Sequence, residues 1–166
     1  MPASLLFVAE APGHLGGVRT GVPLQGDQSG RNFRSYCAAA GIDLGQAFIC
    51  NAVLCHPPSA EGRNRPPRAG EVANCNDFLA EIVELVDPAL VVALGRVALG
   101  ALARISPHGL HFGEDVARAV PWQGRRLISL YHPSGQTQGR RSRALQIEDY
   151  RAVGAAVAAS RGRVIG

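Results

Sequence analysis

Four short apolar runs recur along the chain, and Gly, Pro or polar residues bound each of them. They cover residues 5–9, 47–54, 89–94 and 126–130. Runs of this length that are rich in strand-forming residues and lack helical periodicity predict buried β-strands. Because the runs are apolar on both faces, we expect helices to cover both sides of the sheet that they form.

Segments suited to helices separate these runs, at residues 30–40, 69–86, 95–104 and 142–159. Strands that alternate with helices predict an α/β fold, in which a parallel sheet is built with right-handed crossovers. A chain of 166 residues suits one domain with one sizeable core. We expect this domain to cover residues 1–160, followed by a C-terminal tail at 161–166.

Composition narrows the class of protein. No apolar stretch approaches the length of a membrane span, and the N-terminus lacks a signal-peptide pattern, so we expect a soluble cytoplasmic protein that binds no membrane. The net charge of +4 mildly favours an anionic partner. All 17 basic residues are Arg, which excludes lysine Schiff-base chemistry and a P-loop lysine. The planar guanidinium of Arg suits contact with phosphate.

Two irregular loops follow the first two predicted strands. The first, residues 14–27, is rich in glycine and long for a strand-to-helix connection, and loops of this length are usually functional. Its glycines would let the backbone approach a ligand closely. The second, residues 55–67, holds four prolines and two arginines.

Three polar side chains lie at or near the carboxyl ends of predicted strands: Glu10, Asn51 and His132. Because ligands bind at that edge of an open α/β sheet, we expect the three to converge on one site. Each has a plainer alternative. Glu10 could be a solvated loop residue or a helix cap, Asn51 could be satisfied by a neighbouring loop, and His132 could be a turn residue ahead of a proline.

Five motifs, in one order along nearly the whole chain, carry a resemblance to a known family. They are Glu-Ala-Pro-Gly at 10–13, the run 20–30 with its Gly-Asp-x-Ser-Gly turn, 51–58 with 64–66, Ala-Leu-Gly-Arg at 93–96, and Tyr-His-Pro-Ser-Gly-Gln-Thr-Gln at 131–138. Together they resemble the uracil-DNA glycosylase superfamily. The chain looks like a member of family 5 (type B) with a first motif similar to that of family 4.

The resemblance implies a three-layer αβα sandwich with a central four-stranded parallel sheet. It also implies excision of uracil that has been flipped out of DNA, by hydrolysis of the N-glycosidic bond to leave an abasic site. Glu10, Asn51 and His132 would be catalytic: Asn51 would bind the uracil edge, and His132 would donate to a pyrimidine oxygen. Further pocket and sugar contacts would come from Ala11, Pro12, Gly13, Leu24, Gly26 and Asp27.

DNA contacts are expected next to the last motif. Ser134, Gly135 and Gln136 would press into the minor groove, and Arg140 and Arg141 would contact phosphates. The implied partner is DNA that carries uracil or another deaminated base, bound by a monomer in a bacterial or archaeal cell, in association with the nucleoid. Because the chain has no lysine, we expect a monofunctional enzyme.

Three departures from the family pattern affect the chemistry. The N-terminal C-x-x-C of the family is missing, and only Cys55 and Cys75 match two of the four ligands of its iron–sulfur cluster. We therefore expect no cofactor and no metal; a 4Fe–4S cluster whose other ligands precede Met1 is the alternative. Gly16 and Gly17 stand where the family has a further polar group, which leaves Glu10, then Asp27 or His14, to activate water. Leu24 replaces an aromatic platform, which weakens base stacking.

Two other functions compete with this one. A catalytically weak or covalently trapping relative would keep the fold and pocket without turnover, and the change at Gly16 and Gly17 is what favours it. A generic nucleotide-binding α/β enzyme is the second alternative. The chain has neither a Gly-x-Gly-x-x-Gly turn after a strand nor a P-loop, which argues against that alternative.

Overall fold

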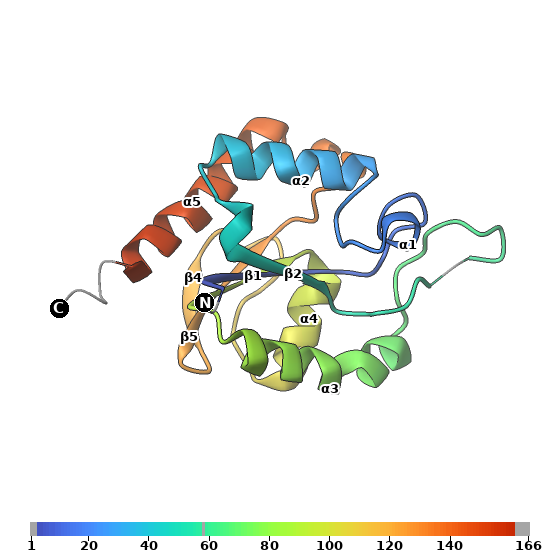
Figure 1. Cartoon of the computed structure of the whole chain (residues 1–166), viewed down its shortest axis with the longest axis horizontal. Helices are drawn as coiled ribbons and strands as arrows, with labels where there is room; N and C mark the ends of the chain where they lie inside the picture. Colours follow the sequence, from blue (N-terminus) through green and yellow to red (C-terminus); the bar gives the residue numbers. More distant parts are fainter. Residues whose placement is uncertain (1–2, 58, 162–166) are drawn as a thin grey trace.

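The computed structural model of the chain describes residues 3–57 and 59–161 (Figure 1). Its strands are β1 (Leu5–Ala9), β2 (Ala47–Asn51), β3 (Leu90–Leu94), β4 (Ala119–Trp122) and β5 (Arg125–Leu130). Its α-helices are α1 (Gly17–Thr20), α2 (Gln28–Ala39), α3 (Ala69–Val86), α4 (Arg96–Ile105) and α5 (Arg143–Arg161). Two 3₁₀ turns, η1 (Leu44–Gln46) and η2 (Gly135–Gly139), complete the regular structure of the described residues.

The strands form a single sheet in the order β2-β1-β3-β5-β4. The four predicted strands are parallel to one another, as expected. The sheet has five strands rather than four, because β4 pairs antiparallel with β5 across a two-residue turn. β4 lies at the edge of the sheet, where its Pro121 can be tolerated. This short strand with a proline gives little periodic signal in the sequence.

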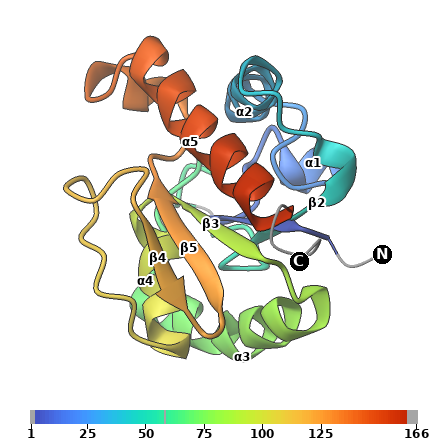
Figure 2. The ribbon, with the colours of Figure 1, turned by 90° about the vertical axis from the view of Figure 1, so that its left-hand side faces the viewer.

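Helices cover both faces of the sheet, so the predicted α/β class and its three layers are confirmed. Alternate residues of β1 point to opposite faces. Leu6 and Val8 pack with the core side chains of α3 and α4, whereas Leu5 and Phe7 pack with those of α2 and α5. Figure 2 shows α2 and α5 on one side of the sheet and α3 and α4 on the other. No helix in the described part of the chain is long and apolar enough to cross a bilayer.

The chain reverses its direction of travel across the sheet at β1. It passes from β1 to the edge strand β2 through α2, and then returns through α3 to β3 on the other side of β1. Open α/β sheets bind ligands in the crevice at the carboxyl ends of such strands. The sheet therefore predisposes the loops at the carboxyl ends of β1 and the neighbouring parallel strands to form a site. The expected domain boundary stays a prediction, and residues 162–166 lie outside the described residues.

The close contact between α5 and the end of α2 generates a first prediction. A Cβ added at Gly154 in α5 would lie 2.9 Å from the backbone oxygen of Ala40, whereas one added at Gly100 in α4 would meet nothing within 4 Å. We expect Gly154→Ala to lower the free energy of unfolding by about 1–3 kcal/mol. The matched control, Gly100→Ala, should raise it by about 0.5–1 kcal/mol. Urea unfolding measures both, and a Gly154→Ala protein as stable as the wild type would contradict the packing of these helices.

Candidate functional site

A cavity of about 690 Å³ opens at the carboxyl edge of the sheet. The loops after β1, β2 and β5 and the start of α2 form its walls. Most of the site residues predicted from the sequence line it, namely Glu10, Ala11, Pro12, Gly13, Leu24, Asp27, His132, Ser134, Gly135 and Gln136. The other predicted residues, Asn51, Gly26, Arg140 and Arg141, do not line it.

Several lining residues received no role in the sequence analysis: Gln28, Ser29, His56, Asn64, Arg65 and Pro66. Their signal was available, because all six lie inside the quoted motifs at 20–30, 51–58 and 64–66, and all except Pro66 are polar. What the sequence could not give is the folding of the second loop back onto the first. His56 Nδ1 donates to the Pro12 carbonyl at 3.0 Å, and the His14 backbone N–H donates to Asn64 Oδ1 at 2.8 Å.

A paired charge fixes the far end of the second loop. Arg65 donates to both carboxylate oxygens of Glu71 at 2.9 and 2.7 Å. This hydrogen-bonded guanidinium lowers the pKa of Glu71 to about 2. Glu71 also accepts from the Arg68 backbone N–H at 2.7 Å, which caps the start of α3. The wall of the cavity formed by residues 64–66 is therefore attached to a helix.

Glu10 directly follows β1 and faces the cavity. Its backbone oxygen accepts from Val53 N at 3.0 Å, which continues the pairing of β1 with the segment after β2. Burial raises the pKa of its carboxyl group. No residue of 3–57 or 59–161 forms a hydrogen bond or ion pair with that carboxylate, so its oxygens are available to a ligand or to water. A carboxylate with a raised pKa in a cleft is suited to accept a proton.

Asp27 caps α2 and faces the same cavity. One of its carboxylate oxygens accepts from the Gly30 N–H at 2.8 Å. The other lies so close to Gly16 that a Cβ there would come within 2.3 Å of it. The presence of glycine at position 16 is therefore explained by packing, because a larger residue there would collide with this carboxylate.

Leu24 lies on the cavity wall with a φ of 51°. A positive φ is uncommon for a bulky residue, and such conformations cluster at functional sites. Its side chain packs against the core between the sheet, α2 and α5. Leu24 thus presents an apolar surface to the cavity at the place where the resemblance implied an aromatic platform.

His132 lies two residues after the end of β5 and is partly buried in the cavity wall. Burial lowers the pKa of its imidazole to about 4, although the negative charge of Asp27 partly opposes this. The ring is therefore neutral at pH 7. A neutral imidazole can donate a hydrogen bond to an oxygen that gains negative charge. Its ring nitrogens form no hydrogen bond with any residue that the structure describes.

Asn51 is the last residue of β2 and lies opposite Ala9 of β1. The residue is 7% exposed. Nothing in the described ranges forms a hydrogen bond with its side-chain amide, although buried amides normally have partners. No loop in the described ranges therefore satisfies the amide. Asn51 is one position in register from Glu10, but its side chain does not line the cavity wall.

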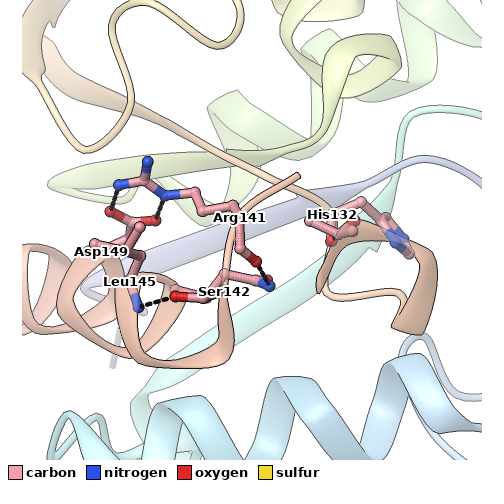
Figure 3. A network of polar contacts seen from close by, with 7 residues as sticks. His132, Arg141, Ser142, Leu145 and Asp149 are labelled. Atoms are coloured by element: carbon pink, nitrogen blue, oxygen red, sulfur yellow. Dashed lines mark hydrogen bonds and ion pairs between the residues drawn. The ribbon is translucent and has the colours of Figure 1, made fainter. Parts of the chain in front are cut away.

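The two predicted phosphate contacts differ in their surroundings. Arg140 is exposed and has no acidic partner among the described side chains. Arg141 donates to both oxygens of the buried Asp149, at 2.5 and 2.7 Å, and lies 6.0 Å from the centroid of the Tyr131 ring. Figure 3 shows the Arg141 guanidinium turned toward Asp149 of α5 and away from His132. The charge of Arg141 is thus already paired within the protein.

The cysteines do not assemble a four-thiolate site. Cys37 and Cys50 are buried in the cores on opposite faces of the sheet, and burial raises the pKa of each thiol to about 12. Cys55 and Cys75 share a smaller cavity of about 150 Å³ with His56 and Glu71. Within the described residues no group of three or more Cys, His, Asp or Glu side chains is arranged to hold a metal ion. These residues therefore do not fit a 4Fe–4S cluster.

Comparison with known proteins places this geometry in context. The family model described as the uracil DNA glycosylase superfamily matches residues 2–153. A type-4 uracil-DNA glycosylase of Thermotoga maritima is 30% identical over 148 residues, which cover 87% of this chain and 73% of that protein. A type-5 uracil-DNA glycosylase of Pyrobaculum aerophilum is 35% identical over 148 residues, covering 80% of this chain and 62% of that protein. A type-4 enzyme of Archaeoglobus fulgidus is 28% identical over 159 residues, with coverage of 92% and 76%. The expected similarity to both types is confirmed.

The lowered pKa of His132 generates a prediction about stability. Between pH 6.5 and about 4 the unfolded chain binds a proton at this residue and the folded protein does not. This group should therefore make stability fall as pH falls through that window, with a slope of up to about 1.4 kcal/mol per pH unit. Urea unfolding from pH 7 to pH 4 should show that His132→Gln removes this part of the slope. Wild-type and variant stability curves that stay parallel across the window would contradict it.

Proposed function

Because the chain belongs to the uracil DNA glycosylase superfamily, we propose that it removes uracil from DNA by hydrolysing the N-glycosidic bond and leaves an abasic site. The main observation behind this proposal is that two complementary side chains line the same cavity. Glu10 supplies a carboxylate with no partner in the described residues, and His132 supplies a neutral donor. These are the groups that hydrolysis with an anionic leaving group requires.

The base must first leave the helical stack, because its glycosidic bond cannot be attacked inside the duplex. Unstacking and unpairing cost a few kcal/mol. In the proposed complex Leu24 and the turn of Ala11, Pro12 and Gly13 contact the base and its sugar, and Asp27 completes the pocket. Gly26 precedes Asp27 in the loop but does not line the cavity. Since Leu24 is smaller than an aromatic ring, stacking contributes less here and hydrogen bonds carry more of the recognition.

His132 stabilises the leaving uracil as negative charge develops on a pyrimidine oxygen. A preorganised donor to such an oxyanion is worth about 3 kcal/mol. The ring can fill this role in its neutral state, because a neutral imidazole keeps one ring N–H that can donate. Asn51 is proposed to recognise the base, since an amide pairs with both a carbonyl and an N–H of uracil. A base that lacks this pattern leaves the buried amide unpaired, which discriminates strongly.

Glu10 is the favoured group to activate the attacking water. Asp27 and His14 are the alternatives, but one Asp27 oxygen already caps α2, and the His14 ring is exposed next to His56. Glu10 instead holds an uncommitted carboxylate in the cavity. We propose no cofactor for this reaction, which needs only a positioned donor and a base.

The proposed DNA contacts lie at the rim of the cavity. Ser134, Gly135 and Gln136 follow His132 and Pro133 and line the cavity, which supports the proposal that they hold the gap left by a flipped base. Arg140 follows them and is the better candidate for a phosphate contact than Arg141, whose charge Asp149 neutralises.

The central test is excision by site variants. We expect His132→Ala and Asn51→Ala each to lower the single-turnover rate of uracil excision by at least about 10²-fold, because each removes a group that stabilises the departing base. The substrate is an oligonucleotide with one uracil, and the readout is strand cleavage after alkali. The control is His111→Ala, which changes an exposed histidine outside the cavity.

Three outcomes separate the proposals. Near-wild-type rates for either variant would contradict the role proposed for that residue. Wild-type protein that binds uracil-containing DNA but releases no uracil, or stays covalently attached to it, would instead support the weak or trapping relative. Wild-type protein that neither binds nor cleaves such DNA would contradict the function as a whole.

The absence of lysine generates a further prediction. Enzymes that cut the strand after base removal usually form a Schiff base with an amine, and this chain has no lysine side chain to supply one. The Met1 amino group lies outside the described residues. We expect borohydride to trap no covalent protein–DNA adduct during excision, and strand breaks to appear only after alkali or heat. A trapped adduct would show that the reaction is not simple hydrolysis.

A further inference from the structure

The position of His132 depends on its backbone, because its ring forms no hydrogen bond with any described residue. We propose that Thr137 and Asn32 are positioning residues, which hold the His132 turn in the geometry needed for donation to the base. This inference rests on the proposed function, in which His132 is that donor. Neither residue touches the base in the proposed complex, and each acts through a backbone carbonyl next to His132.

Thr137 belongs to the segment expected to face DNA, yet its side chain is buried. Its hydroxyl donates to the His132 carbonyl at 2.7 Å. The same hydroxyl lies 3.0 Å from the Ser134 hydroxyl, and the Thr137 N–H donates to the Ser134 carbonyl at 3.1 Å. These bonds hold η2 against the backbone of His132, the residue whose orientation the proposal concerns.

Asn32, in α2, binds the carbonyl of Pro133, the residue that follows His132. It is 3% exposed in α2, and its Nδ2 donates to the Pro133 carbonyl at 2.9 Å, across 101 residues of sequence. Its Oδ1 accepts from Gln28 Nε2 at 2.9 Å, and Gln28 Oε1 accepts from Arg31 at 3.1 Å. Arg can only donate and a proline carbonyl can only accept, so every bond in this series has one possible direction. The Asn32 amide is therefore fixed in its orientation.

Two further constraints act on the backbone of His132 besides the bonds from Thr137 and Asn32. A residue before proline is confined to extended backbone conformations. Gly95, with a φ of 98°, lies so close that a Cβ there would be 3.2 Å from the His132 Cβ. Gly95 thus bounds the backbone and Cβ of His132 on one side, and the Thr137 and Asn32 bonds hold the turn in place against it. A displacement of about 1 Å at a reacting group can cost about 10²-fold in rate.

The Thr137 test uses two nearly isosteric changes. Thr137→Val removes the hydroxyl and keeps the shape, whereas Thr137→Ser keeps the hydroxyl. We expect Thr137→Val to lower the single-turnover rate at saturating enzyme by about 10-fold or more, and Thr137→Ser to stay within about 2-fold of wild type. The dissociation constant for uracil-free duplex should be unchanged in both, because neither side chain contacts DNA in this proposal.

The Asn32 test has a matched control in Asn76. Asn76 is also a helical asparagine whose Nδ2 donates to a backbone carbonyl, that of Ala101, at 2.9 Å, but it lies between α3 and α4. Both Asn32→Ala and Asn76→Ala should lower the melting temperature. Only Asn32→Ala should lower the excision rate, by about 10-fold to 10²-fold. If Asn32→Ala does not fold, the Thr137 pair decides the question.

A second readout does not depend on activity. NMR titration of the His132 ring should give a pKa near 4 in wild type and Thr137→Ser, and a higher pKa in Thr137→Val and Asn32→Ala, because a loosened turn admits water to the ring. If wild-type protein excises no uracil, the proposed function fails while this titration still tests the positioning. Thr137→Val and Thr137→Ser proteins that match in both rate and titration, or an Asn32→Ala protein no more affected than Asn76→Ala, would overturn the proposal.

Discussion

The parallel pairing of β1, β3 and β5 is the constraint on which the rest of the molecule depends. β1 and β3 are apolar and buried along their whole length, and β5 is buried from Leu127 to Leu130 with Ser129 as its one polar residue there. Charged side chains therefore gather where a strand ends and its backbone turns into a loop. Parallel strands all end at the same edge of the sheet. Glu10 and His132 therefore line one cavity there, although more than 120 residues of sequence separate them. The site is thus a consequence of how the core is built.

The same burial sets the electrostatics of the site. Removing water from Glu10 disfavours its negative form, and removing water from His132 disfavours its positive form. One group is thereby made a better proton acceptor than an ordinary carboxylate, and the other is kept a neutral donor. Asp27 partly opposes the effect on His132 but does not restore its usual pKa. A single physical cause, desolvation at the sheet edge, therefore gives two side chains complementary roles.

Features of the structure that are set by neighbouring residues could be predicted from the sequence, and those set by distant partners could not. The four parallel strands and the helix over 69–86 follow from apolar pattern and end signals in the neighbouring residues, and the structure has them. β4 was missed because its four residues include a proline and pair with a strand only through a tight turn. The partner of Arg141 was missed for another reason: a charge in a sequence does not show which carboxylate folds against it. Thr137 and Asn32 were hidden in the same way, since their partners are carbonyls fixed by the tertiary fold.

The polar side chains that hold the site in place have hydrogen-bond partners within the protein, whereas those proposed to act on the substrate do not. Asn32, Thr137 and Arg141 are each held by hydrogen bonds within the protein, and these bonds join separate segments of the chain. Glu10, Asn51 and the His132 ring have no such partners within the described residues, although burial without a partner is costly. Within the described residues the buried hydroxyls of Tyr36, Tyr150 and Ser129 also lack partners, as do one nitrogen each of His56 and Arg125 and the Gln146 amide oxygen. The two tyrosine rings pack against each other between α2 and α5. We propose that a flipped base and a water molecule satisfy Glu10, Asn51 and His132, so that the cost borne by the free protein becomes binding and transition-state stabilisation once DNA is bound.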